Sequence, residues 1–276
     1  MINQQNEYGD MKRVIVCPPK YMKIKKIINE TQKHYEDENI DAEIAMEQHQ
    51  QFVQTLKEMD IEVIELTPAQ VLNEQVFTRD IGFVVDDILF TCEMESEIRK
   101  PEINVLHTLL KHEQILYTPL TTPSIEGGDV IVAQDKLFIG DSGRTTIEAI
   151  NDLQRQLPDK EVIPLPIRED ILHLDCCFNL VSDKVGIIYS DAFQAQDRNM
   201  LHNEFDLIEV PVEEHFTLGT NVFSIGEGKV ISLPENKQVN KQLSERGFQV
   251  IEVPFSEIIK SGGSFRCCTL PIERMN

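Results

Sequence analysis

The sequence predicts an α/β fold built from five repeated ββαβ units that close into a propeller-like ring. Three observations favour it: a strand pair that recurs about every 46 residues, a helix and a further strand after the pair, and two chain ends that each resemble half of a fifth unit. A repeat of this length is typical of solenoids and propellers, whose terminal units are often irregular.

Each repeat begins with a polar triplet, followed by an apolar strand, a tight turn rich in acids or glycine, and a second apolar strand. The four complete copies begin at Thr78, Gly127, His173 and Gly219. The third residues of their triplets are Asp80, Asp129, Asp175 and Asn221, which are 49, 46 and 46 positions apart. A further step of 46 positions reaches Cys267. Because these strand starts are equivalent, we expect their side chains to point at one common centre.

Helix and strand periodicity completes the units. Apolar residues recur at helical spacing between Ile44 and Met59, and an alternating strand pattern follows from Ile61. The last unit has the same order, with a helix that ends at Arg246 and the strand FQVIEV after it. The C-terminal CTLPI then supplies only a first strand, and the N-terminal RVIVCPP supplies a second. We therefore expect the termini to pair and close the ring, which removes exposed sheet edges.

The chain is long enough, at 276 residues, to bury a substantial core. The repeat favours one catalytic domain over residues 11–276, with a flexible N-terminal arm at residues 1–10. No apolar run is as long as a membrane-spanning helix requires, and the first residues lack the apolar region of a signal peptide. These features favour a cytoplasmic protein.

The charge balance is strongly acidic, with 26 basic and 47 acidic side chains and a net charge of −21. Nucleic acids and anionic membranes bind through lysine and arginine, so we expect neither as a partner. The acidity has two readings: it keeps the protein soluble, or it attracts a cationic substrate. The composition leaves the oligomeric state open, and a homo-oligomer is compatible with it.

The six cysteines are Cys17, Cys92, Cys176, Cys177, Cys267 and Cys268. We expect free thiols in a cytoplasmic chain, and adjacent pairs do not have the spacing of a zinc site. Most of them lie in apolar strands, where cysteine packs as a small hydrophobe. Only Cys267 follows a glycine-rich loop, SGGSFR, and its neighbour Cys268 should face the opposite side of the strand.

Five polar side chains are expected to converge at the strand starts: Asp80, Glu126, His173, Asp175 and Cys267. A cysteine nucleophile needs a nearby base or positive charge, and His173 can supply either. Several carboxylates around a thiol would oppose its ionisation unless the substrate is itself a cation. A guanidinium group suits such a site because its paired N–H donors match carboxylates, and this chemistry calls for neither a metal nor a cofactor.

Two arginines are candidates for holding a carboxylate elsewhere on the substrate. Arg144 lies in the loop GDSGRTT after one strand pair, and Arg99, the weaker candidate, lies in SEIRKPE after another. Each site residue also has a structural reading: Asp80 could form a surface salt bridge, Arg144 could pair locally, and His173 could be a core histidine. Their joint placement at equivalent positions favours the functional reading.

Five motifs resemble those of a known superfamily: FTRD (Phe77–Asp80), EGGDV (Glu126–Val130), GRTT (Gly143–Thr146), HLD (His173–Asp175) and GGSFRC (Gly262–Cys267). They are similar to the motifs of guanidino-group-modifying enzymes, which include arginine deiminase, dimethylarginine dimethylaminohydrolase and the glycine amidinotransferases. The resemblance spans nearly the whole chain and implies the five-bladed α/β propeller called the pentein fold. In size the chain resembles dimethylarginine dimethylaminohydrolase, whereas FTRD and HLD look more like arginine deiminase. The acid of HLD, Asp175, argues against a dimethylated substrate.

The resemblance also implies a mechanism. Cys267 would attack the guanidinium carbon, carboxylates would hold its nitrogens, and His173 would act first as an acid and then as a base. The substrate-binding set would be Asp80, Asp175, Arg144, Phe77 and Arg99. The expected reaction is hydrolysis of arginine or an N-methylated arginine to citrulline or a related ureido product. Two alternatives stay open: an amidinotransferase, in which an amine replaces water, and a non-catalytic propeller that serves as a binding module.

Overall fold

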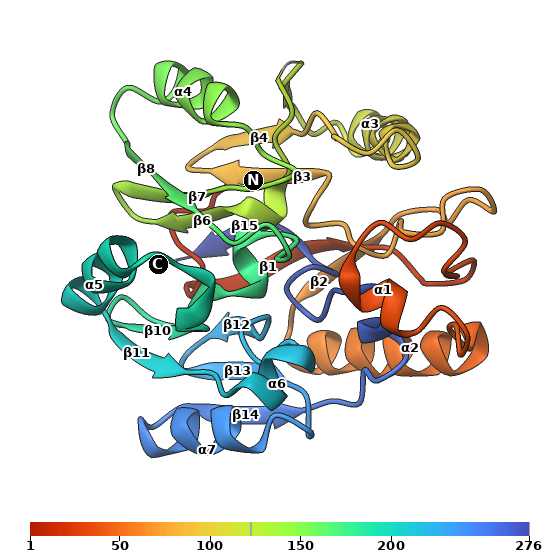
Figure 1. The fold of residues 1–276 in the computed structure, drawn as a ribbon. Helices are drawn as coiled ribbons and strands as arrows, with labels where there is room; N and C mark the ends of the chain where they lie inside the picture. The colour runs from red at the N-terminus through yellow and green to blue at the C-terminus, as the bar shows by residue number, and fades with distance from the viewer. Residues whose placement is uncertain (122, 276) are drawn as a thin grey trace.

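The computed structural model of the protein describes residues 1–121 and 123–275, which contain five three-stranded sheets (Figure 1). The first sheet has the order β15 (Leu270–Met275), β1 (Asp10–Val16), β2 (Glu62–Glu65), and the second β3 (Gly82–Val85), β4 (Ile88–Thr91), β5 (Thr118–Pro119). The third comprises β6 (Val130–Ala133), β7 (Lys136–Asp141) and β8 (Glu161–Pro166). The fourth comprises β9 (Phe178–Leu180), β10 (Val185–Ile188) and β11 (Asp206–Glu209), and the fifth β12 (Phe223–Gly226), β13 (Lys229–Ser232) and β14 (Gln249–Glu252).

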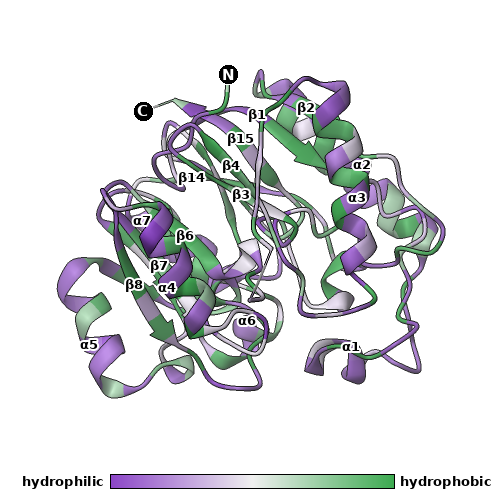
Figure 2. Cartoon of the chain, turned by 90° about the horizontal axis from the view of Figure 1, so that it is seen from above, coloured by the Kyte–Doolittle hydropathy of each residue, from purple (hydrophilic) through white to green (hydrophobic). Residues whose placement is uncertain are grey.

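Each unit has a helix between its second and third strands, as the ββαβ pattern predicts. The α-helices are α1 (Glu30–His34), α2 (Ala42–Glu58), α3 (Lys100–His112), α4 (Ile147–Gln156), α5 (Ala195–Glu204), α6 (Val212–Phe216) and α7 (Lys237–Glu245). Short 3₁₀ turns are η1 (Gly127–Asp129), η2 (Leu174–Cys176), η3 (Ser190–Ala192) and η4 (Ile258–Ser261). Figure 2 shows hydrophobic strands inside and hydrophilic surfaces on helices such as α5 and α7. Among the described residues, no helix combines the length and apolar character needed to cross a membrane.

The two chain termini share one sheet, which confirms the predicted pairing. Strand β1 runs antiparallel to β15, with Val14 opposite Pro271 and Ile15 opposite Leu270. Its other neighbour, β2, runs parallel to it after the crossover through α2. The helix of this crossover begins where Asp41 accepts hydrogen bonds from two backbone N–H groups of the first turn, as an N-cap residue does.

Neighbouring sheets touch one another in chain order. The backbone N–H of Gly127 donates to the carbonyl of Asp80 at 3.0 Å and joins the second and third units. Strand β6 contacts β9, and the side-chain amide of Asn179 donates to the carbonyl of Thr220 at 3.0 Å, joining the fourth and fifth units. The sheet formed by the termini contacts β3 through β15 and β12 through β1. These contacts fit a pseudo-symmetric five-unit propeller.

The triplets end in short turns rather than at the strand starts themselves. Asp129 is the last residue of η1, Asp175 lies within η2, and Cys267 lies in the turn that precedes β15. A 3₁₀ turn puts the third triplet residue just before its strand, where the side chain reaches toward the neighbouring unit. These turns, rather than the strands, place the side chains of the third triplet residues near a common centre.

The N-terminal segment packs against the propeller instead of forming the flexible arm expected at residues 1–10. The backbone N–H of Asn3 donates to Ile272 at 3.0 Å, and that of Gln4 donates to Asp86 at 2.8 Å. The Glu7 side chain is buried and accepts a 3.1 Å hydrogen bond from the backbone N–H of Val132. Gln4, Asn6 and Glu7 are the buried residues of this segment, and the arginines that pair with Glu7 come from distant parts of the chain.

Glu7 is the buried counter-charge of three arginines. Its carboxylate lies 3.1 Å from Arg266 and 3.6 Å from Arg79. Burial alone would raise the pKa of Glu7. The pKa is nevertheless held below its ordinary value by three positive charges, those of Arg266, Arg79 and Arg274. The segment is therefore part of the charge balance of the protein core.

Replacing Glu7 with glutamine is expected to lower the free energy of unfolding by about 3–5 kcal/mol, because it leaves buried arginines without a counter-charge. A depressed carboxyl pKa stabilises the fold above the pKa of the unfolded state, so the difference from wild type should shrink as the pH falls below about 4. Urea unfolding at several pH values measures both effects. The matched control is Glu65→Gln, at an exposed acid of β2. Equal stability of Glu7→Gln and wild type at neutral pH would contradict the expectation.

Candidate active site

Backbone hydrogen bonds between units bring the predicted site together. The N–H of Arg79 donates to the carbonyl of Cys267 at 3.0 Å, which fixes the FTRD loop against the C-terminal turn. The N–H of Cys267 in turn donates to the side-chain oxygen of Asn221 at 3.1 Å. Gly128 allows the His173 ring to lie close to the backbone, because a Cβ at position 128 would be 2.8 Å from the ring.

A small, enclosed cavity lies at this junction. Six of its lining residues belong to the predicted site: Phe77, Asp80, Arg99, Arg144, His173 and Cys267. Its free volume is about 10 Å³, which is the room that one water requires. The remaining predicted residues do not line the cavity themselves but contact residues that do: Glu126 contacts His173, and Asp175 contacts Cys267. Ile28 and Asn29, which precede α1, also line the cavity.

His173 is held between two carboxylates. Its Nε2 lies 2.8 Å from Glu126 Oε2, and its Nδ1 lies 3.6 Å from Asp80 Oδ1. Burial disfavours the charged ring, but Asp80, Asp129 and Glu126 outweigh it and raise the pKa of His173 to about 10. His173 is therefore an imidazolium at neutral pH and can donate a proton to a leaving amine.

Cys267 is the only cysteine among the residues that line this cavity. Its Sγ lies 3.5 and 3.6 Å from the two oxygens of Asp175, and the amide of Asn221 donates to it at 3.1 Å. Burial, reinforced by Cys176 and Asp175, raises the pKa of Cys267 well above its ordinary value. The free protein therefore holds a thiol, and a cation beside the sulfur would favour the thiolate.

The two predicted arginines have different surroundings. The guanidinium of Arg99 is buried, pairs with Asp80 at 2.5 Å and pairs with Glu102 at 2.9 Å. This geometry makes Arg99 a positioning residue for Asp80, and its predicted role as a carboxylate clamp stays untested. Arg144 lies at the cavity edge, donates to the carbonyl of Ile28 at 2.9 Å and has Glu126 at 3.8 Å. Displacing the Ile28 segment would free this guanidinium for a substrate carboxylate.

Phe77 is placed against the nucleophile by a glycine. A Cβ at Gly263 would lie 2.4 Å from the Phe77 ring and 3.0 Å from Cys267 Cβ. The glycine of the GGSFRC motif therefore lets the ring and the thiol approach one another. This contact accounts for a feature of the motif that the sequence alone left unexplained.

Sequence reasoning missed two charged residues of the site. Glu74 lines the cavity and accepts hydrogen bonds from Gln32 and Ser261, each at 2.9 Å. Arg266 pairs with Asp175 at 2.7 Å and so holds the carboxylate that contacts Cys267. Glu74 falls outside the repeated triplets, and only its place just before FTRD could have marked it. Arg266 directly precedes the nucleophile and could have been noticed within GGSFRC.

Asp80, Glu126 and His173 place one potential ligand atom each within 4.8 Å of one another. A metal ion would need a lone pair from the histidine ring. The imidazolium described above offers none, since both ring nitrogens face carboxylates. A metal ion at these three residues would therefore have to displace the ring proton that the neighbouring carboxylates stabilise.

Comparison with solved structures gives the class of protein. The N-terminal domain of ArgZ, an arginine dihydrolase from the ornithine–ammonia cycle in cyanobacteria, superposes with a TM-score of 0.86 at 24% identity. The match covers 96% of this chain and 98% of that domain. This likeness shows the five-unit α/β propeller of the pentein fold, which the resemblance in sequence implied.

Sequence comparison then gives the family. Residues 18–274 match the family described as "N,N dimethylarginine dimethylhydrolase, eukaryotic", and the chain belongs to that family. The uncharacterized protein YkgA of Bacillus subtilis is 49% identical over 98% of this chain and 94% of its own length. The N(G),N(G)-dimethylarginine dimethylaminohydrolase of Mycobacterium tuberculosis is 27% identical, over 85% of this chain and 78% of its own.

Proposed function

We propose that the protein hydrolyses the guanidinium group of arginine or an N-methylated arginine through a covalent intermediate on Cys267. One observation carries the proposal: a thiol and an imidazolium face the same enclosed cavity, whose wall also bears carboxylates. Glu74 and Asp80 lie on that wall, and Asp175 lies against the sulfur. Such a cavity complements a planar cation with several N–H donors.

The first step forms the intermediate. The docked guanidinium stabilises the Cys267 thiolate, whose proton passes to solvent. The sulfur then bonds to the guanidinium carbon, His173 gives its proton to one nitrogen, and the bond between carbon and that nitrogen breaks. The amine or ammonia leaves, and a thiouronium remains attached to Cys267.

The second step releases the product. His173, now neutral, removes a proton from water, and the hydroxide oxygen bonds to the thiouronium carbon. The bond between carbon and sulfur breaks, the electron pair returns to Cys267, and the sulfur takes up the hydroxyl proton as a ureido product such as citrulline departs. His173 keeps the proton that it took from water and restores its ion pair with Glu126.

The carboxylates favour an unsubstituted guanidinium. Each methyl group on a guanidinium nitrogen replaces an N–H donor and leaves a buried carboxylate oxygen without its hydrogen bond. The cost of that unpaired oxygen discriminates strongly against the methylated substrate. Asp175 is fully buried and has Arg266 and Cys267 as neighbours, so it offers no apolar space for methyl groups. We therefore expect arginine to be used better than monomethylarginine, and monomethylarginine better than dimethylarginine.

A ureido-product assay tests the proposal with arginine, mono- and dimethylarginine, agmatine and guanidinoacetate. Turnover of at least one compound, absent in Cys267→Ala, is the expected result. No ureido product, together with a new guanidino compound when an acceptor amine is added, would identify an amidinotransferase instead. Binding of a guanidino compound without any turnover would identify a non-catalytic binding module. Either of these outcomes would overturn the hydrolase proposal.

Glu74→Gln is expected to lower kcat/KM for arginine by about 10- to 100-fold, mainly through KM, because a charge-assisted hydrogen bond contributes about 1.5–3 kcal/mol. The change is nearly isosteric, so the unfolding midpoint should stay close to that of wild type. Steady-state kinetics and thermal unfolding measure the two quantities. Glu95→Gln, at a half-exposed acid 4.0 Å from Arg144, is the matched control. An unchanged KM in Glu74→Gln would show that this carboxylate does not contact the substrate.

The activity is expected to rise with pH across the neutral and mildly alkaline range. The free enzyme needs a Cys267 thiolate and a His173 imidazolium, and the raised pKa of Cys267 keeps the thiolate scarce at neutral pH. Profiles of kcat/KM should therefore rise by up to about tenfold per pH unit and fall only as His173 loses its proton near pH 10. Glu126→Gln removes one of the carboxylates beside the His173 ring, so the falling limb of the kcat/KM profile should move to lower pH. A profile that falls between about pH 7 and 9 would contradict this assignment.

A further inference from the structure

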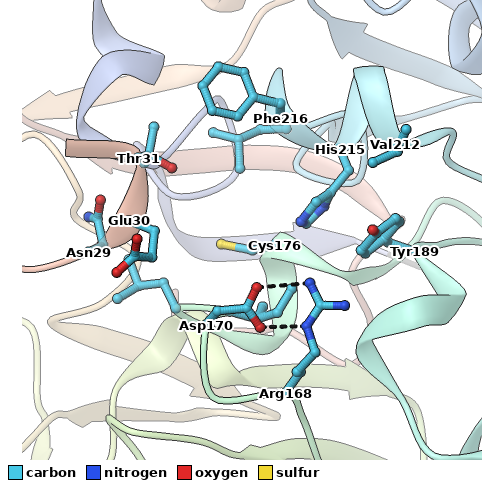
Figure 3. A pocket seen from close by; sticks show the side chains of 14 residues that line it. Asn29, Glu30, Thr31, Arg168, Asp170, Cys176, Tyr189, Val212, His215 and Phe216 are labelled. Carbon is cyan, nitrogen blue, oxygen red and sulfur yellow. Dashed lines mark hydrogen bonds and ion pairs between the residues drawn. The ribbon is translucent and has the colours of Figure 1, made fainter. Parts of the chain in front are cut away.

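A second cavity adjoins the catalytic one. It has a volume of about 300 Å³ and shares Asn29, Leu172 and Gly262 with the catalytic cavity as lining residues. Figure 3 shows the Cys176 sulfur near its middle, with His215 and Tyr189 on one side and the Arg168–Asp170 ion pair below. Cys176 retains 4% of its surface and is therefore reachable from this cavity.

The sulfurs of Cys176 and Cys267 meet at one carboxylate oxygen. Cys176 Sγ donates to Asp175 Oδ1 at 3.6 Å, and Cys267 Sγ donates to the same atom at 3.6 Å. The two thiols are close enough to affect each other's ionisation, since Cys176 contributes, after burial, to the raised pKa of Cys267. Cys177 has different surroundings, since its sulfur faces the carbonyl of Leu174 at 3.3 Å. Because the sulfurs of Cys176 and Cys267 each lie 3.6 Å from Asp175 Oδ1, they are at most 7.2 Å (twice 3.6 Å) apart. Neither Cys176 nor Cys267 belongs to a β-strand, so a disulfide between them would disrupt no strand pairing.

We propose that Cys176 is an oxidation site through which a peroxide reversibly inactivates the protein, by forming a disulfide between Cys176 and Cys267. The catalytic cavity has room for one water only, whereas the second cavity gives a peroxide molecule access to Cys176. The disulfide removes the nucleophile, so the protein is inactive until a thiol reduces it. The inference is independent of which guanidino compound is the substrate.

The oxidation has two balanced steps. The Cys176 sulfur bonds to one peroxide oxygen, the O–O bond breaks, and the other oxygen leaves as water with the thiol proton, giving a sulfenic acid. The Cys267 sulfur then bonds to the Cys176 sulfur, and the S–O bond breaks. The departing hydroxide takes the Cys267 thiol proton and leaves as a second water. Asp175 Oδ1 accepts hydrogen bonds from both thiols and is placed to pass these protons.

The experiment exposes the fully reduced protein to hydrogen peroxide and follows turnover, free thiols after denaturation, and disulfide-linked peptides. In wild type we expect turnover to fall together with the loss of two of the six thiols. Dithiothreitol should restore both, and the linked peptide should join Cys176 to Cys267. A linked peptide that joins other cysteines, or none at all, would overturn the proposal. Thiol and peptide measurements need no substrate, so a failure of the proposed function is recognised separately.

Two variants separate this route from direct oxidation of the nucleophile. Cys176→Ser should lose activity at least about tenfold more slowly than wild type and form no linked peptide, because the reachable sulfur is absent. Cys177→Ser, the matched control, should behave as wild type. In Cys267→Ala, Cys176 should form a sulfenic acid that dimedone labels, which tests the first step without turnover. Inactivation of Cys176→Ser at the wild-type rate would show that peroxide reaches Cys267 directly and would overturn the proposal.

Discussion

Cys267→Ala is expected to lower turnover of the preferred guanidino compound by at least about 10⁴-fold, because no other thiol is among the residues that line the catalytic cavity. The side chain is small and buried, so its truncation should leave the fold intact. Binding should persist, since Glu74, Asp80 and Arg144 are unchanged. Product assays and equilibrium binding measure the two quantities on one protein preparation.

Cys268→Ala is the matched control for the nucleophile. Cys268 is buried beside Cys267 but does not line the catalytic cavity. Its backbone N–H donates to the carbonyl of Ser264, so the turn should survive the change. Full turnover in Cys267→Ala together with an inactive Cys268→Ala would show that the nucleophile had been assigned to the wrong cysteine.

His173→Gln is expected to lower kcat by about 10²- to 10⁴-fold, the usual contribution of a general acid and base. The glutamine amide can still donate to Glu126, but it cannot carry a proton between the leaving amine and water. Both chemical steps should slow, so the loss should appear in kcat more than in KM. Stopped-flow and steady-state kinetics test this, with His112→Gln at an exposed histidine as the control. A His173→Gln protein with wild-type kcat would remove His173 from the mechanism.

The internal repeat explains why so much of the site could be predicted from sequence. Asp80, Asp175 and Cys267 occupy equivalent positions in different units, and equivalent positions in a propeller converge whatever the details of packing. The pairing of RVIVCPP with CTLPI was predictable for the same reason, because each segment is half of a unit. His173 and Glu126 lie within three residues of a repeated position and were found with it.

Residues outside the repeat could not be found in this way. Glu74 contributes to the cavity from an irregular loop, and Glu7 reaches the core from a polar segment without any apolar pattern. Both are held by polar groups from distant parts of the chain: Glu74 by Gln32 and Ser261, and Glu7 by Arg266. A buried ion pair between distant residues has no local periodicity, so a single sequence does not reveal it. The ion pair of Arg99 with Asp80 was hidden for the same reason.

The central claim is that Cys267 forms a covalent bond to the guanidinium carbon and that ammonia or an amine leaves from that carbon. Mass spectrometry of the protein after acid quenching of its reaction with arginine tests this most directly. The expected result is an adduct on the Cys267 peptide with the mass of arginine less ammonia, absent in Cys267→Ala. An adduct that carries only the amidino group would show that ornithine leaves instead of ammonia, as the first step of an amidinotransferase requires. Turnover of arginine that proceeds without any adduct at Cys267, in wild type or in Cys267→Ala, would contradict the covalent mechanism.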